Sequence, residues 1–424
     1  MKQTIVTLIM VSLFGLTACS KNPSSADPVS KQSAKTILYW NEIAFEAFGG
    51  IAYQHSLMAS RINTMMHLAI HDALNGIEEK YERYAFAGKD EKADPLAAAA
   101  SAAHTILLQE IPGRQGFLDS ALATSLDYAG DEIAKVRGIE LGKNAALAIL
   151  DKRLNDNSTG DLLVPVPPSA QPGVYQATPP FNIFFAPHWE NVKLFSLNDK
   201  SQFRCAPQPA MNSDTYREDF EEVKATGKIN SESRTPDQSS YAKFWYEFSE
   251  AGWNRISREV VKAKNMNMLD AARLFALVDM ALADAYIAGW DSKIYYNFWR
   301  PYTAIRNAST DGNDATTGDT GWEPAEPTPP VPDYPSTHSA LGNAASTVLA
   351  SIIGDNTAFS FTSPTGIPGS NSRAFQSFSQ ASNENADSRV RAGIHFRFSC
   401  EAGQQLGNKI GKWTVERHLK PIVK

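Results

Sequence analysis

Apolar residues recur at three- and four-residue intervals along most of this chain, and that spacing predicts amphipathic α-helices. Strand-like alternation is sparse, and the Pro-rich segment 164–187 and the Gly-, Asp- and Thr-rich segment 308–332 are expected to be loops. Helices are predicted over 44–80, 95–111, 117–129, 131–154, 213–225, 236–250, 253–264, 268–290, 339–353 and 401–417. The pattern therefore predicts a mostly α protein of two packed helical bundles, with an N-terminal helical region over 36–200 and a C-terminal region over 201–424.

The first residues follow a different pattern. An apolar run from Ile5 to Leu16, followed by Thr17, Ala18 and Cys19, is typical of a signal peptide over 1–18. The ending resembles a bacterial lipobox, which implies cleavage before Cys19 and lipidation of its thiol; an ordinary signal peptide with an incidental cysteine is the alternative. Residues 19–35 are polar and rich in Ser and Pro, so we expect a flexible tether. Mass spectrometry of the mature N-terminus should find a lipidated cysteine.

This N-terminus predicts an exported bacterial lipoprotein that is anchored to a membrane through Cys19 and faces the periplasm or the exterior. Because Ser20 rather than Asp follows, resemblance to known sorting rules favours the outer membrane. The chain as a whole has an ordinary composition for a soluble enzyme, with 43% hydrophobic and 20% charged residues. A net charge of -6 without a basic stripe argues against nucleic acid as a partner. The sequence leaves the oligomeric state open.

Three short stretches of the C-terminal region carry the candidate chemistry. They run from Lys293 to Pro301, from Pro335 to His338 and from Ser388 to His395. Together they supply cations that neutralise oxygen atoms, a hydroxyl and backbone amides that donate hydrogen bonds, and two imidazoles that can bond a central atom or move protons. This combination indicates a site that holds a tetrahedral oxyanion and does chemistry on it.

The spacing within the stretches suggests how each side chain is placed. Lys293 and Arg300 are seven residues apart and should share one helix face, with Trp290 one turn earlier. Ser336 should lie at a helix N-terminus, where free amides suit an anion. Arg389 and His395 would point to different faces of a continuous helix, so the glycine between them should break it. Taken singly, these residues have simpler readings as solvated cations, a core tryptophan, a helix cap and structural histidines.

Taken together, the residues resemble the superfamily of type 2 phosphatidic acid phosphatases, bacterial acid phosphatases and vanadium-dependent haloperoxidases. The family pattern is Lys, six residues, Arg-Pro; then Pro-Ser-Gly-His; then Ser-Arg, five residues, His, and this chain departs from it only at Thr337. The position of Trp290 and the sequences around Arg300 and His395 resemble the haloperoxidase branch. The similarity extends back to about Tyr39 and therefore implies the helical fold of that branch for nearly the whole mature chain.

The resemblance also implies roles for these residues. His395 would be the axial ligand of vanadium and His338 the general acid-base. Lys293, Arg300 and Arg389 would neutralise the oxygens, helped by Ser336 and the Thr337 amide, with Trp290 beside them. The implied function is a vanadate-dependent haloperoxidase-like enzyme that oxidises iodide or bromide with hydrogen peroxide, Lys293 polarising the bound peroxide. Two alternatives remain: an acid phosphatase that binds phosphate and cleaves a phosphoester through a phosphohistidine at His395, and a non-catalytic oxyanion-binding surface lipoprotein.

Three departures from the family pattern bear on that function. Thr337 replaces Gly and would resist a positive φ. Val331 stands where characterised haloperoxidases carry an aromatic residue or His. Ser399 stands where the family often has Asp, so a carboxylate that orients His395 must come from elsewhere.

Overall fold

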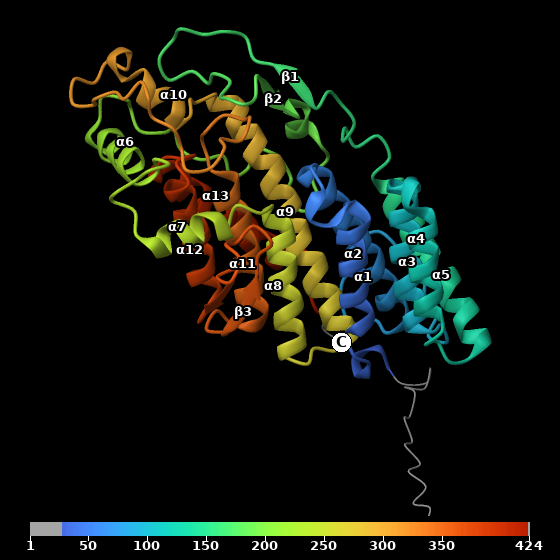
Figure 1. Ribbon diagram of the computed structural model, residues 1–424. Helices are drawn as coiled ribbons and strands as arrows, with labels where there is room; N and C mark the ends of the chain where they lie inside the picture. The colour runs from blue at the N-terminus through green and yellow to red at the C-terminus, as the bar shows by residue number, and fades with distance from the viewer. Residues whose placement is uncertain (1–27, 423–424) are drawn as a thin grey trace, which may run out of the picture.

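The computed structural model describes residues 28–422, which form a mostly helical protein (Figure 1). The signal peptide and Cys19 lie outside the described residues. Two short antiparallel hairpins, β1 with β2 and β3 with β4, accompany the helices. The helices are α1 (Lys35–Phe48), α2 (Ser56–Ile77), α3 (Pro95–Glu110), α4 (Gln115–Leu126), α5 (Glu132–Lys152), α6 (Asp214–Thr226), α7 (Pro236–Phe244), α8 (Ser249–Ala263), α9 (Met268–Tyr296), α10 (Pro301–Arg306), α11 (Thr337–Ile353), α12 (Phe378–Arg391) and α13 (Arg397–Arg417). The strands are β1 (Leu163–Pro165), β2 (Ile183–Phe185), β3 (Phe359–Thr362) and β4 (Ser372–Phe375).

The long helix α9 joins the two groups of helices. It packs against α2 on the N-terminal side and against α11 and α13 on the C-terminal side, and Figure 1 shows it running between the blue-to-cyan and the orange-to-red parts of the chain. Nearly all its side chains up to Lys293 are buried, as expected for a helix that is covered on every face. One continuous apolar cluster consequently extends from the first helices to the last.

Several predicted helices are confirmed, and the differences have local causes. Asp94 caps α3 by accepting a hydrogen bond from the amide of Ala97, with Pro95 in the first turn. The single helix predicted over 44–80 is wrong because Gly49 adopts a φ of 118° and ends α1. The polar sequence of α12 has no clear apolar stripe, so its helix was not predicted. The Pro-rich segment is a loop apart from the hairpin at its ends.

The predicted tether is shorter than expected. Val29 is fully buried, and the hydroxyl of Ser30 donates a 2.6 Å hydrogen bond to Glu78. Ser33 also forms a β-bridge with Asn267, which caps α9. The packed fold therefore includes residues from 28 onward rather than from 36. No helix within residues 28–422 has the length and apolar character needed to cross a membrane.

Helices α11 and α13 approach closely because α13 presents glycines to α11. A Cβ atom on Gly403 would lie 2.3 Å from the carbonyl oxygen of Ser336, and one on Gly407 would lie 2.0 Å from that of Ala340. Both distances are far inside van der Waals contact, so only glycine fits. This close packing fixes the N-terminal end of α11, where the second sequence motif begins.

Replacing Gly407 with alanine should destabilise the protein, because a new methyl group would force the two helices apart. We expect the free energy of unfolding to fall by about 1–3 kcal/mol, measured by urea unfolding followed by circular dichroism. Gly116→Ala in α4 is the matched control, because its Cβ would meet nothing within 4 Å. Equal stability of Gly407→Ala and the wild type would contradict the close packing.

Candidate oxyanion-binding site

The three motifs meet at helix ends on the C-terminal side of α9. Lys293 lies in the last turn of α9, but Asn297 adopts a φ of 44° and ends that helix. Arg300 then precedes α10, whose first residue is Pro301. The prediction that Lys293 and Arg300 share one helix face is therefore wrong. The turn between the helices instead directs both cations toward the segment 329–335.

Lys293 anchors the segment that leads into α11. Its buried ammonium donates to the carbonyl oxygens of Pro332 at 2.6 Å, Asp333 at 3.0 Å and Pro335 at 2.7 Å. These three acceptors match the three N–H groups of an ammonium. Burial, and next the nearby charge of Arg300, lower the pKa of Lys293 well below its ordinary value.

Arg300 connects the same segment to His395. Its Nε donates to the carbonyl oxygen of Val331 at 2.7 Å, and one terminal nitrogen donates to that of Ile394 at 2.7 Å. The same nitrogen lies 2.9 Å from Nε2 of His395. It also lies 3.3 Å from Nδ1. Because a guanidinium only donates and Nε2 is the nearer ring nitrogen, we assign Nε2 as the acceptor and the ring hydrogen to Nδ1.

Ser336 caps α11, as predicted, by accepting from the amide of Ser339. Thr337 begins the helix and is not among the residues with positive φ, so its β-branched side chain is accommodated without strain. Its methyl group would be 3.5 Å from a Cβ on Gly289 of α9. The departure from Gly at this position therefore leaves the amide-rich end of α11 intact.

His338 is the least enclosed of the motif residues, and the others named are buried. Its Nε2 lies 3.0 Å from the carbonyl oxygen of Glu247. A carbonyl only accepts, so Nε2 carries the hydrogen and Nδ1 is free to take a proton. Burial, and next the charge of Arg389, lower the pKa of His338 well below its ordinary value, which keeps the ring neutral at neutral pH.

The third motif turns at a glycine, as predicted. Gly393 has a φ of 80° between the end of α12 and the start of α13. Arg389 is buried and donates to the carbonyl oxygen of Trp245 at 3.0 Å, and burial lowers its pKa to about 10. Burial and then the charges of Arg300, Lys293 and Arg389 lower the pKa of His395 well below its ordinary value. All three cations are thus close enough to act on His395.

Trp290 lies one turn before Lys293 on α9, but it contacts Phe185 of the Pro-rich segment and Tyr286 of its own helix. The indole N–H donates to the carbonyl oxygen of Phe185 at 3.2 Å, and the ring packs edge-on against Tyr286. Trp290 therefore joins the Pro-rich segment to α9.

Asp333 is the site residue that the motifs did not reveal. Its buried Oδ1 lies 2.9 Å from Nδ1 of His395, and the hydroxyl of Ser399 donates to its other oxygen. Burial raises the pKa of Asp333 to about 6, against the opposing effect of Arg300. The sequence signal that could have identified Asp333 was its position just before the second motif, two residues after Val331.

The cluster fits a tetrahedral oxyanion such as vanadate or phosphate. Lys293, Arg300 and Arg389 are each only 1% exposed, and among the described residues none of them donates a hydrogen bond to a carboxylate, so positive charge is in excess. Nε of Arg389 is among the buried polar atoms of the described residues that have no hydrogen-bond partner. A buried donor of this kind is normally satisfied, and an anion held by Arg389 would satisfy it.

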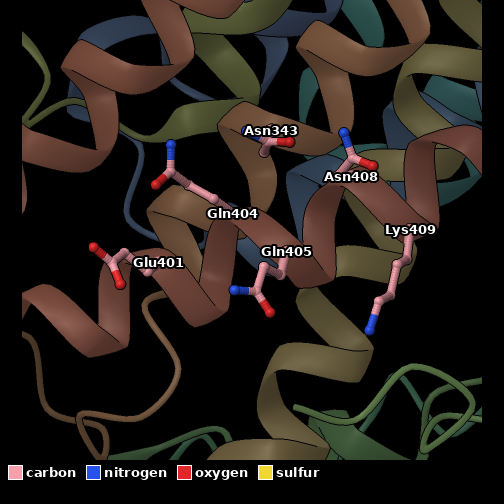
Figure 2. A pocket seen from close by; sticks show the side chains of 6 residues that line it. All are labelled: Asn343, Glu401, Gln404, Gln405, Asn408 and Lys409. Carbon is pink, nitrogen blue, oxygen red and sulfur yellow. The ribbon is translucent and has the colours of Figure 1, made fainter. Parts of the chain in front are cut away.

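A separate hollow lies on the outer surface over α11 and α13. It has a volume of about 440 Å³ and is lined by Asn343, Glu401, Gln404, Gln405, Asn408 and Lys409 (Figure 2). None of the residues of the three motifs lines it. The hollow and the cationic cluster are therefore distinct features.

Known proteins share both the sequence and the fold. A family model described as the second helical-bundle domain of VCPO matches residues 273–423. Vanadium chloroperoxidase of Curvularia inaequalis is 29% identical over 217 residues, a match that covers 43% of this chain and 34% of that protein. The match thus spans only about a third of the relative's length.

Solved structures match over most of the chain. A bacterial vanadium-dependent iodoperoxidase superposes with a TM-score of 0.79 at 26% identity, covering 92% of this chain and 98% of its own. The apo- and holo-type bacterial vanadium-dependent chloroperoxidases each have a TM-score of 0.70, at 19% and 18% identity. They cover 84% and 87% of this chain, and 92% and 93% of their own, and show the shared fold. The family match over residues 273–423, the curated relative and the fold shared with the iodoperoxidase together support the vanadium haloperoxidase superfamily.

Proposed function

We propose that this protein is a vanadate-dependent haloperoxidase that oxidises iodide or bromide with hydrogen peroxide. The observation that carries the proposal is the buried ring of His395, whose Nε2 lies 2.9 Å from Arg300 and whose pKa is lowered by burial and then by the charges of Arg300, Lys293 and Arg389. A bare imidazole nitrogen is a suitable ligand for a metal centre, and the cations suit the oxygens around that centre. The superfamily and the bacterial iodoperoxidase of similar fold support the same activity.

His395, Arg300, Arg389 and Ser336 are the residues that would hold vanadate. Bound vanadate would supply the Lewis-acid centre at which peroxide is activated for attack by a halide. Nε2 of His395 would give its lone pair to that centre in place of accepting from Arg300, and the guanidinium groups, Arg300 included, would neutralise oxygens by forked hydrogen bonds. The ammonium of Lys293 already donates to three carbonyl oxygens, so it would act on the bound oxyanion mainly through its charge.

His338 would move the proton. Its Nε2–H is held by the carbonyl oxygen of Glu247, so Nδ1 is the atom that accepts. The lowered pKa keeps this ring neutral at neutral pH, in the form that accepts a proton from an incoming peroxide. After accepting, it can return the proton to the oxygen that leaves.

The halide preference should be iodide over bromide, without chloride oxidation. Val331 is buried, and it can neither donate a hydrogen bond to peroxide nor offer a ring edge to a halide. Iodide is the easiest halide to oxidise and makes the least demand on peroxide activation. Initial rates with the three halides at equal concentration measure this order, and efficient chloride oxidation would contradict the interpretation of Val331.

Two assays on one preparation test the proposed function. Protein freed of vanadate should oxidise iodide with hydrogen peroxide only after vanadate is added back. The same preparation without vanadate should show little hydrolysis of a phosphoester. Fast hydrolysis without peroxidase activity would instead support the phosphatase alternative at His395, and absence of both would support a non-catalytic anion-binding protein.

A further inference from the structure

We propose that Asp333 is the positioning residue for His395 and that Ser399 holds Asp333 in place. The carboxylate that orients the histidine then comes from the loop before α11 instead of from the helix that follows His395. This inference rests on the proposed function only in taking His395 as the residue that binds the oxyanion.

The contacts of Asp333 point to this role. Its side chain is completely buried, and Oδ1 lies 2.9 Å from Nδ1 of His395. Arg300 is farther from that oxygen, at 3.8 Å. Among the described residues Oδ1 has no hydrogen bond of good geometry, and Nδ1 of His395, at 2.9 Å, lies nearer to it than Arg300 does. A buried carboxylate without a donor would be costly.

Ser399 holds the carboxylate oxygen of Asp333 that does not face His395. Its hydroxyl donates to Oδ2 of Asp333, and its own carbonyl accepts from the amide of Ser336 at 2.8 Å. The backbone of Asp333 is itself fixed, because its amide donates to the carbonyl oxygen of Phe298 at 2.9 Å. Asp333 is therefore held on its backbone and on one carboxylate oxygen, leaving the other oxygen for His395.

The position of Ser399 explains why the carboxylate comes from elsewhere. Ser399 lies four residues after His395 in the first turn of α13, where related sequences often carry Asp. In this chain the Asp stands at 333 and the Ser at 399, and their side chains touch. Because the Ser399 hydroxyl touches Asp333, whose other oxygen is 2.9 Å from Nδ1, exchanging Asp and Ser between the two positions should keep a carboxylate near the histidine.

The consequence is a fixed tautomer of His395. A carboxylate beside Nδ1 stabilises the ring form that has its hydrogen there, and Nε2 stays bare toward Arg300. Without that carboxylate the two neutral tautomers become closer in energy and the ring is free to turn. Fewer molecules would then present a bare Nε2, and affinity for an oxyanion would fall.

The exchange itself provides the test, on the full chain purified without vanadate. Nitrogen NMR of ¹⁵N-histidine-labelled protein reports the tautomer of His395, and calorimetry with inorganic phosphate and with vanadate reports binding. We compare the wild type with Asp333→Ala, Asp333→Asn, Asp333→Ser and the double variant Asp333→Ser with Ser399→Asp. Asp311→Asn removes another buried carboxylate, whose Oδ2 accepts from Thr316, and is the control.

Asp333→Ala and Asp333→Ser should mix the tautomers and weaken anion binding by about 10–100-fold. Asp333→Asn, whose amide oxygen still accepts, should lose less, and the control should keep the wild-type signal. The double variant should restore a single tautomer and most of the affinity. A single Nδ1–H tautomer with normal affinity in Asp333→Ala, or a folded double variant without recovery, would overturn the proposal.

If Asp333→Ala does not fold, the tautomer of His395 and the anion affinity are measured in Asp333→Asn and the double variant instead, and these two results test the proposal. The result is also independent of the proposed chemistry. A protein that lacks peroxidase activity but shows the predicted tautomer and rescue would refute the proposed function and leave the role of Asp333 standing.

Discussion

Replacing His395 with alanine should abolish turnover and leave weak oxyanion binding. The change removes the one ring nitrogen that is bare and surrounded by three cations, so no ligand remains for a metal centre and no nucleophile for phosphorus. We expect a loss of roughly 10³-fold or more in kcat, in line with the removal of a group that bonds the reacting centre. Lys293, Arg300 and Arg389 remain, so phosphate should still bind.

Kinetics and calorimetry on the same preparation measure these two effects separately. His104→Ala is a suitable control, because His104 pairs with Asp119 on the N-terminal side and is remote in sequence from the motifs. Activity close to the wild type in His395→Ala would refute the assigned role. A complete loss of phosphate binding would show that the cations alone do not form the site.

His338→Ala should slow turnover by about 10²–10⁴-fold while leaving anion affinity nearly unchanged. The reason is that Nδ1 of His338 is the proton acceptor and the ring is neutral, so its removal takes away proton transfer but no positive charge. The prediction is checked by comparing kcat with the phosphate dissociation constant. His338→Gln should be equally slow, because an amide side chain cannot take up the proton. A large loss of affinity with normal kcat would assign His338 to binding instead.

Local sequence signals were sufficient for much of the fold. The turn at Gly393 was predicted because a glycine between two residues on different helix faces marks a break in the helix. The end of α9 at Asn297 was not predicted, since no change in apolar spacing marks the left-handed conformation of that residue. That error placed Lys293 and Arg300 on one helix, whereas a turn brings them to the same loop.

The site shows the same division. The motif residues were recognisable from their types and spacing, and the structure brings their helix ends together. Asp333 was not recognisable, because its relation to His395 depends on a contact across sixty-two positions of the chain, 395 minus 333. The presence of Ser at 399 indicated that another residue must supply the carboxylate that orients His395, but the sequence did not show which residue it is. Sequence spacing predicts neighbours within one helix and gives little information about which loop meets which helix end.

A crystal structure of the protein with vanadate would test most directly the claim that His395 bonds vanadate among the three cations. We predict vanadium bonded to Nε2 of His395, with its oxygens contacted by Arg300, Arg389 and Ser336 and with Asp333 still beside Nδ1. Vanadate bound in the surface hollow over α11 and α13, or bound at the cluster without a bond to His395, would contradict the claim.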